Sequence, residues 1–499
     1  MALTPPARSE TYRLAKAVGV LAVMASAVSQ EYASGINFVA TQSLGVYPLV
    51  EGLVPLAMFV TGFLLLPKVV LYMRFSRYMP RAGSAYVWIG RTLSLPVSFV
   101  VNFLWWVGLT SAVGVIAFTF GTFLGDALLA AGWTSGGNAV LTTLGHIVIG
   151  LAAIWTVYWI HTRGIGTFGA LVQILFALVV VTALLIVGYG LLTPSSHFLT
   201  AASAASGMPL VAPKTSPPPS FGQFVSTCTL FVFAYGGLNS APTLGGEAVE
   251  AGKTVPRGIF LAWITAILLF SAVSLAVFNV APWWALGTLI AHGGSAYATT
   301  PAVIGLVAPH AVGVVLDLIV AVVVGKTLLP QLMATSRLAF AWAEDGLFGE
   351  TFVKTSERRT PNAALFLVAL IGSVFCVESS TVAWSVGTII RSFSILAVLG
   401  VLAIGLLVAK WSPRFKDVEW AQKITAGWGI VVAAVAALVV AVLLVSSVLV
   451  VPNTSFVFQP IFQVAVAVLL GMALYRVAKQ RGERSGRPLR AIITELPLE

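Results

Sequence analysis

Charged residues are scarce in this 499-residue chain, where they make up 9% of the positions. A soluble globular domain carries about a quarter charged residues, so the composition excludes an ordinary cytosolic enzyme. Hydrophobic residues make up 58% of the chain, and they gather in runs of about 20 residues or more, long enough to cross a bilayer as helices. Runs of this length exclude an outer-membrane barrel, whose strands alternate over about 10 residues. The sequence therefore predicts an all-α integral membrane protein.

Cysteine is almost absent as well, with only Cys228 and Cys376, each inside an apolar run. Two such residues predict neither a disulfide framework nor a metal site. The sequence shows no serine–histidine–acid set, no phosphate-binding loop and no cluster with metal-ligand spacing. We therefore expect no catalytic residues, no cofactor and no bound metal.

Long apolar runs predict twelve transmembrane helices. They cover approximately residues 17–47, 49–73, 84–124, 139–161, 167–192, 221–247, 256–280, 305–342, 362–379, 384–409, 425–451 and 459–478. The runs at 84–124 and 305–342 exceed one bilayer crossing, so the first of them must tilt or begin as an interfacial segment. An even number of spans puts both ends of the chain on one side of the membrane.

Positive charge is distributed unevenly between the two sides of this predicted bundle. All but three of the 28 lysines and arginines flank the spans on the side of the two tails; Lys214 lies on the other side, and Lys326 and Arg391 fall inside spans. Lysine and arginine mark cytoplasmic loops, so we expect both tails to be cytoplasmic and the protein to lie in the cell membrane. The net charge of +11 is then matched by anionic lipid headgroups, and no nucleic-acid partner is expected.

Small and polar residues interrupt the first and the sixth run near their middles. The first contains Ser29–Asn37 (SQEYASGIN) and the sixth contains Phe233–Ser240 (FAYGGLNS). An unwound helix exposes free amides on one side, which favour a carboxylate, and free carbonyls on the other, which favour a cation. Interrupted helices in matching positions of two halves are typical of inverted-repeat transporters with a midplane site. The alternative is that Gly35, Gly236 and Gly237 only allow close helix packing.

Four separated motifs, in order, resemble those of a known family. They are Ala33–Ile36 (ASGI), Tyr78–Tyr86 (YMPRAGSAY) with Arg91 after it, Phe233–Pro256 with its Glu247, Lys253 and Thr254, and Ser336–Pro361 with its AEDGL and TP elements. Over residues 16–410 the chain thus resembles the amino acid–polyamine–organocation (APC) permeases.

The resemblance implies a core of ten helices in two inverted five-helix repeats, with discontinuous first and sixth helices and two peripheral helices. The organisation that we predict is a cytoplasmic N-terminal tail (1–16), the first repeat (17–193), an extracellular loop (194–220), the second repeat (221–410), the two peripheral helices (411–479) and a basic cytoplasmic tail (480–499).

The resemblance also implies a substrate site between the two breaks. In the family, amides at the first break hold the substrate α-carboxylate and carbonyls at the sixth hold the α-amino group, and an aromatic residue such as Phe233 or Tyr235 closes over the ligand. The implied substrate-binding residues are Ser34, Gly35, Ile36, Phe233, Ala234, Tyr235, Gly236 and Asn239.

Three departures from the family pattern bear on coupling. Asn239 stands where many members carry a glutamate in the sixth helix. Many proton-linked members carry a lysine midway along the fifth helix; that position falls near Val180, and the span 167–192 has no charge. Glu31 stands where the family is usually apolar.

Ionisable residues inside spans cost about 2.5–3.5 kcal/mol, and by default they indicate function. Lys326 lies near the middle of the eighth span, four residues before Pro330, which cannot donate a hydrogen bond to the Lys326 carbonyl. We interpret Lys326 and Glu31 as candidates for proton coupling, with Lys326 supplying the positive charge that the fifth span lacks. A permanent structural pair between Glu31 and Lys326 is equally compatible with the sequence.

Other polar residues in the spans carry weaker signals. Arg391 lies in the outer half of the tenth span and is a gate candidate facing the extracellular vestibule, with snorkelling to the outer interface as the alternative. Thr327 and Gln331 share one face of the eighth span by their i,i+4 spacing, and either line the pocket or serve in packing. Asp317 and Glu378 lie near outer helix ends, where we expect both to be solvated.

The sequence therefore predicts a secondary active transporter of an amino acid or amino-acid derivative. It would alternate access by moving the first and sixth spans, with proton symport or exchange as the energy source. Its partners would be a small-molecule substrate, a proton or exchanged solute, and membrane lipids. A neutral or anionic amino acid is favoured, because the predicted pocket offers Lys326 and Arg391 against Glu31. A polyamine or organic-cation transporter anchored at Glu31 is the alternative, and a ligand sensor that does not transport is the alternative of another class.

Overall fold

The computed structural model describes residues 18–163, 165–445, 451 and 454–484. Apart from an isolated bridge between Val18 and Ala248, the regular structure of these residues is helical. Within the described ranges, eight helical segments are long and apolar enough to cross a membrane, and three helix pairs bent by more than 40° pass the same test together. The all-helical membrane fold predicted from the composition is confirmed.

Every apolar run of the first half contains helix. The elements there are α1 (Val20–Glu31), the π-helical η2 (Tyr32–Val39), α2 (Ala40–Val46), η3 (Pro48–Leu53), α3 (Val54–Leu64), α4 (Leu66–Tyr78), α5 (Ala85–Thr92), α6 (Leu95–Ala130), α7 (Thr134–Val140), α8 (Thr143–Thr162), α9 (Ile165–Leu192) and α10 (Ser195–Ser206). The long run at 84–124 begins as a separate short helix, α5, in agreement with its excess length.

The second half follows the same pattern. Its elements are α11 (Phe221–Phe231), η4 (Phe233–Tyr235), α12 (Gly237–Ser240), η5 (Ala241–Gly246), α13 (Ala251–Val280), α14 (Trp283–Ala291), η6 (Ser295–Ala298), α15 (Thr300–Val307), α16 (His310–Glu344), η7 (Glu350–Phe352), α17 (Asn362–Thr381), α18 (Trp384–Trp411), η8 (Pro413–Phe415), α19 (Glu419–Thr425), α20 (Gly429–Val445), η9 (Phe456–Phe458) and α21 (Pro460–Arg484). Helix α16 continues through Pro330.

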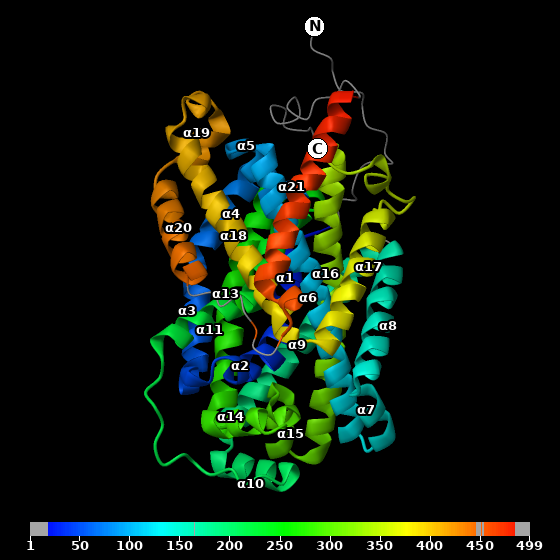
Figure 1. The fold of residues 1–499 in the computed structure, drawn as a ribbon, viewed down its shortest axis with the longest axis vertical. Coiled ribbons are helices and arrows are strands. Elements are labelled where there is room, and N and C mark those ends of the chain that lie inside the picture. The colour runs from blue at the N-terminus through cyan, green and yellow to red at the C-terminus, as the bar shows by residue number, and fades with distance from the viewer. Residues whose placement is uncertain (1–17, 164, 446–450, 452–453, 485–499) are drawn as a thin grey trace.

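The segment 194–220 differs from the plain loop that the sequence predicts. Its first half forms α10, which turns by 104° from the axis of α9. Pro194 ends the preceding helix, because it supplies no amide to continue the helical hydrogen bonds. Helix α10 lies at one end of the bundle with α14 and α15, and α19 lies at the opposite end (Figure 1).

The long helix α6 forms the centre of the bundle. Of its most apolar 18-residue stretch 89% is buried, against 22% for α8 and for α21. A helix apolar on all sides belongs in the interior, and α16 and α18 pack along it while α8 and α20 lie at opposite edges (Figure 1). The core therefore provides a rigid support against which the interrupted helices α1–η2–α2 and α11–η5 are placed.

Candidate functional site

The first predicted break is a π-helical segment, η2, rather than unwound backbone. π-Helical turns are rare and are found frequently at functional sites. Just before and within it, polar side-chain atoms are buried without a hydrogen-bond partner in the described structure: Ser29 Oγ, both amide atoms of Gln30 and the Tyr32 hydroxyl. Buried polar groups are nearly always paired with protein or water, so this region has unused capacity to bind a polar ligand.

The second break interrupts the sixth run where the sequence predicts it. Helix α11 ends at Phe231, a 3-10 turn covers Phe233–Tyr235, and the helical segments on either side of Gly236 are bent by 43°. The break exposes the carbonyls of Tyr235 and Gly236, which accept hydrogen bonds from side chains of other helices.

The two breaks are in direct contact. A Cβ atom on Gly35 would lie 2.9 Å from Cβ of Ala234, and one on Gly237 would lie 1.9 Å from the carbonyl oxygen of Ala27. These glycines therefore permit close packing, as the alternative interpretation held, and they do so at the breaks themselves. Close packing and interruption of the helices occur together here.

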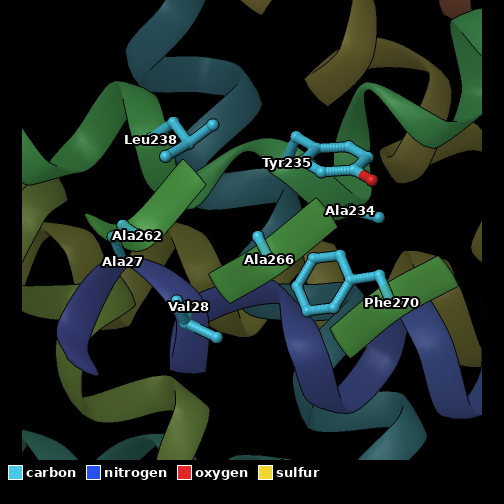
Figure 2. Close-up of a pocket in the computed structure, with 8 residues that line it drawn as sticks. All are labelled: Ala27, Val28, Ala234, Tyr235, Leu238, Ala262, Ala266 and Phe270. Carbon is cyan, nitrogen blue, oxygen red and sulfur yellow. The ribbon is translucent and has the colours of Figure 1, made fainter. Parts of the chain in front are cut away.

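A small apolar pocket lies beside this contact. Figure 2 shows side chains from α1, from the second break and from α13 around it. The lining residues are Ala27, Val28, Ala234, Tyr235, Leu238, Ala262, Ala266 and Phe270. The pocket has no room for a water-sized sphere, whereas ligand pockets usually measure about 300–1,000 Å³, so the two breaks are closed against each other.

The predicted carboxylate-binding residues are tied to neighbouring helices. The Ser34 hydroxyl is 2.9 Å from the hydroxyl of Thr119 on α6, and the Ile36 carbonyl accepts a hydrogen bond of 3.0 Å from Thr300 at the start of α15. Gly35 contacts Ala234. The structure therefore places Ser34, Gly35 and Ile36 against α6, α15 and the second break.

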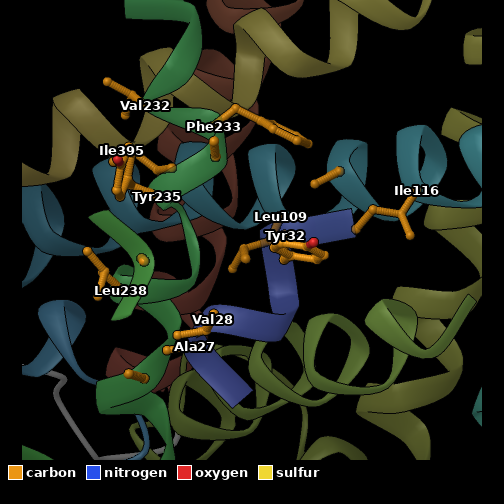
Figure 3. Close-up of a cluster of buried hydrophobic side chains, with 14 of the residues drawn as sticks. Ala27, Val28, Tyr32, Leu109, Ile116, Val232, Phe233, Tyr235, Leu238 and Ile395 are labelled. Atoms are coloured by element: carbon orange, nitrogen blue, oxygen red, sulfur yellow. The ribbon is translucent and has the colours of Figure 1, made fainter. Parts of the chain in front are cut away.

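The two aromatic residues of the second break differ in role. Figure 3 shows their side chains leaving the broken segment in different directions. The Tyr235 hydroxyl donates to the carbonyl of Met58 at 3.0 Å, and its ring lies 5.4 Å from that of Phe270. Tyr235 is thus anchored to α3 in this conformation, which leaves Phe233 as the aromatic candidate to close over a ligand.

A lysine that sequence reasoning placed among the cytoplasmic flanking charges belongs to the site. Lys68, on α4, is 0% exposed, and its ammonium donates to the Asn239 amide oxygen at 2.7 Å and to the Tyr235 carbonyl at 3.3 Å. The Asn239 amide nitrogen in turn donates to the Tyr72 hydroxyl at 2.8 Å. The assignment of Lys68 to the flank of a loop was wrong, because helix α4 continues from Lys68 to Tyr78. The apolar residues that follow Lys68 could have indicated that the helix continues.

Arg391 also contacts the second break. Its side chain is 0% exposed, and Nη2 donates to the Gly236 carbonyl at 3.3 Å. Snorkelling to the outer interface is therefore excluded in this conformation, and the guanidinium lies beside the broken helix rather than in an open vestibule. Its part as a gate stays a prediction.

The eighth-span candidates on α16 connect the breaks to the central helix. Thr327 donates to the Ser29 carbonyl of α1 at 3.0 Å, and the Gln331 amide donates to the Leu109 carbonyl of α6 at 2.7 Å. Both serve helix packing, and Gln331 Oε1 has no partner in the described structure. They do not line the small pocket.

Lys326 lies on the same helix and is 5% exposed, and its ammonium makes no hydrogen bond within the described part of the chain. The Glu31 side chain falls outside the described residues, so its pairing with Lys326 stays a prediction. Two other expectations were wrong: Asp317 and Glu378 are each 8% exposed rather than solvated. Neighbouring helices cover these positions; for example, the Gln463 side chain of α21 donates a hydrogen bond to the Glu378 carboxylate.

A polar network closes the end of the bundle at which α16 terminates, called here the tail-side end. Glu247, just after η5, accepts hydrogen bonds from Arg337 Nη2 at 2.7 Å and Nε at 3.0 Å, and both side chains are at most 3% exposed. The Glu247 carbonyl accepts from the Val18 amide, and the Val249 amide donates to Val18. The sixth span is thereby fastened both to α16 and to the start of α1.

The chain is similar to transporters of known name. It is 28% identical over 339 residues, 64% of this chain and 66% of the relative, to the branched-chain amino acid permease BcaP of Lactococcus lactis subsp. cremoris (strain MG1363). It is 24% identical over 159 residues, 32% of each chain, to the D-serine/D-alanine/glycine transporter of Escherichia coli (strain K12). The matched region spans just under two thirds of the first relative's length.

A match to a family model agrees with these similarities. The model described as amino acid permease matches residues 18–472, which includes both helix breaks and the tail-side network. This confirms the resemblance carried by the four sequence motifs, and with the apolar helices it makes the chain a multi-pass membrane protein of a transporter family, not of an enzyme family. The chain belongs to the amino acid permease family.

Proposed function

We propose that the protein is a secondary active transporter that carries an amino acid across the cell membrane by alternating access. The contact of two interrupted helices at Gly35 and Ala234 carries the proposal. Twelve spans, with a core of two inverted five-helix repeats and discontinuous first and sixth spans, complete the proposed architecture, and both termini are cytoplasmic. Interrupted helices of matching position are where such folds bind substrate.

The substrate lies between η2 and η4 when the two breaks separate. Amides of Ser34, Gly35 and Ile36 receive the α-carboxylate, and carbonyls of Phe233 and Ala234 receive the α-amino group. The Tyr235 carbonyl is left out of this assignment because it already accepts a hydrogen bond from Lys68. Polar atoms of Gln30 and Tyr32, which have no hydrogen-bond partner among the described residues, are available to a bound ligand or its water.

An apolar substrate side chain fits the surroundings of the breaks. Buried hydrophobic residues of α1, α6 and the sixth span converge there, among them Val28, Leu109, Ile116 and Leu238 (Figure 3). The branched-chain specificity in the name of the Lactococcus relative agrees with this lining. We therefore assign neutral amino acids with apolar side chains as the substrate class.

Alternating access then follows from where the closing contacts lie. In this conformation the breaks touch and the Glu247–Arg337 pair closes the tail-side end. Movement of α1–α2 and α11–η5 against the α6–α16 support separates these contacts and opens a path to the site. Lys326 is the coupling candidate, because its ammonium is buried inside a span and makes no hydrogen bond to any described part of the chain, and ionisable residues at such positions by default indicate function.

Counterflow tests the proposal directly. Proteoliposomes loaded with one unlabelled amino acid are diluted into the labelled compound, with leucine, alanine, glutamate, lysine and putrescine as competitors. Accumulation that neutral apolar amino acids suppress supports the proposal. Accumulation driven only by putrescine indicates an organic-cation transporter, and ligand binding to folded protein without accumulation indicates a sensor; either result rejects it.

A further inference from the structure

The tail-side end of α8 carries an exposed cation whose orientation is set by a ring. The guanidinium carbon of Arg163 lies 4.0 Å from the centroid of the Trp159 ring, one helical turn earlier. A guanidinium stacks flat on an aromatic face and presents its N–H donors at its edge. Among the described residues no hydrogen bond from the Arg163 side chain is found. Its donors therefore have capacity for a partner that is not part of this described chain.

A second arginine reaches the same helix end from the segment between α16 and α17. Arg358 Nη1 donates to the Arg163 carbonyl at 3.3 Å, one of the last carbonyls of α8, which have no helical amide to accept from. A guanidinium has several N–H donors, and this bond uses one of them. Both arginines are exposed. Two cations are thus gathered at one point of the surface by contacts that hold each in place.

Acidic side chains do not neutralise this point within the described residues. Helix α8 contains no aspartate or glutamate. The acid nearest along the chain, Glu357, is exposed, and the ion pairs found among the described residues include neither it nor the two arginines. The helix end therefore offers net positive charge together with oriented donors, which is what an anion requires.

The position of Trp159 indicates where that anion comes from. Its side chain is 54% exposed, and the most apolar stretch of α8 is only 22% buried inside the protein. Helix α8 packs beside α17 at an edge of the bundle (Figure 1). Exposed tryptophans of transmembrane helices lie at the level of the lipid headgroups. Arg163, one turn further toward the tail side, is then at the level of the lipid phosphates.

We propose that Arg163 and Arg358 bind the headgroup phosphate of an anionic phospholipid in the tail-side leaflet. The planar guanidinium matches a phosphate with two parallel hydrogen bonds, and Trp159 is the platform that holds one of the two in position. A lipid bound there joins the end of α8 to the segment that precedes α17. This inference goes beyond the proposed transport function and does not depend on it.

Native mass spectrometry of the full chain in a neutral detergent tests the site. Phosphatidylglycerol and phosphatidylcholine are titrated separately, and the dissociation constant of the first bound lipid is compared between variants. Arg163→Gln and Arg358→Gln each remove one arginine of the site. Arg257→Gln is the matched control, because it removes one exposed arginine from α13 at the same end of the bundle. Melting temperatures without added lipid show which variants are folded, and either site variant suffices.

We expect each site variant to bind phosphatidylglycerol at least about fivefold more weakly than the wild type, since one cation near anionic lipid contributes about that factor. Arg257→Gln changes the constant by less than about twofold, and an excess of inorganic phosphate leaves the lipid bound. Equal weakening in the site and control variants indicates general attraction and overturns the proposal. Equal wild-type affinity for phosphatidylcholine overturns it as well, and displacement of phosphatidylglycerol by inorganic phosphate shows a site for the free ion instead of a lipid.

Discussion

The buried ion pair between Glu247 and Arg337 holds the tail-side end closed. The substitution Glu247→Gln tests how strongly this pair favours the closed conformation. The substitution keeps the shape and one acceptor but leaves Arg337, 3% exposed, without its opposing charge. Breaking a buried ion pair from one side costs about 3–5 kcal/mol. In a conformation open at this end, water solvates Arg337 and most of that cost disappears. The equilibrium therefore shifts toward opening by up to about 10²- to 10³-fold.

Cysteine accessibility measures this shift. Ser240 is the last residue of the second break, on the side of Glu247; it is 5% exposed, and its hydroxyl has no partner in the described structure. Ser240→Cys is thus a conservative reporter, and the native Cys228 and Cys376 are buried and give a low background. In the Glu247→Gln background we expect maleimide added from the tail side to react with the reporter at least about tenfold faster.

Glu250→Gln provides the matched control. This glutamate is three residues away, and it pairs with Lys253 at the surface, where the two side chains are 67% and 72% exposed. Exposed pairs contribute about 0–1 kcal/mol at most, so its removal leaves the labelling rate unchanged. If Glu247→Gln and Glu250→Gln label at the same rate as the parent, the ion pair does not hold this end closed and the reasoning is wrong.

Other predictions concern the breaks and the coupling lysine. Gly237→Ala puts a Cβ atom 1.9 Å from the Ala27 carbonyl oxygen, so we expect transport to fall below a tenth of wild type. Gly222→Ala, whose Cβ would meet Ser220 Oγ at an ordinary contact distance of 3.7 Å, transports normally. Lys326→Met removes the proposed proton carrier and abolishes the response of leucine uptake to an imposed pH gradient, while counterflow continues; a retained response contradicts the assignment. Tyr235→Phe loses one hydrogen bond, to Met58, worth about 0.5–1.5 kcal/mol; we expect a lower melting temperature with an unchanged KM, whereas a large rise in KM indicates that Tyr235 contacts the substrate.

The positions of both breaks could be predicted because they depend on local sequence. Ser29–Asn37 and Phe233–Ser240 each place glycine and polar residues inside an apolar run, and the structure changes its helical geometry at both. The sequence did not show that the first break is π-helical, nor that its Gly35 packs against Ala234, about 200 positions away. Local pattern contains no information on such a contact.

The contacts of Lys68 and Arg391 with the second break could not be predicted for a different reason. Lysines near helix ends are counted as flanking charges, and Lys68 is followed within ten residues by Arg74 and Arg77. Its depth becomes visible only when helix α4 is seen to continue to Tyr78 and to pack against the sixth span. Arg391 was recognised as lying inside a span, but its partner, a backbone carbonyl, leaves no trace in the sequence.

The bridge between Val18 and the segment after η5 has a consequence for how this protein can vary. Both of its hydrogen bonds join main-chain atoms, at 2.9 and 3.1 Å, so ordinary side-chain substitutions leave them in place. Two such bonds contribute about 1–3 kcal/mol after hydration of the freed groups is counted, and an opening that separates these two segments must overcome this free energy. Relatives with different substrates can therefore differ throughout the pocket and keep the same minimum resistance to opening. Among the common residues only proline removes one of these main-chain hydrogen bonds, because it lacks the amide hydrogen.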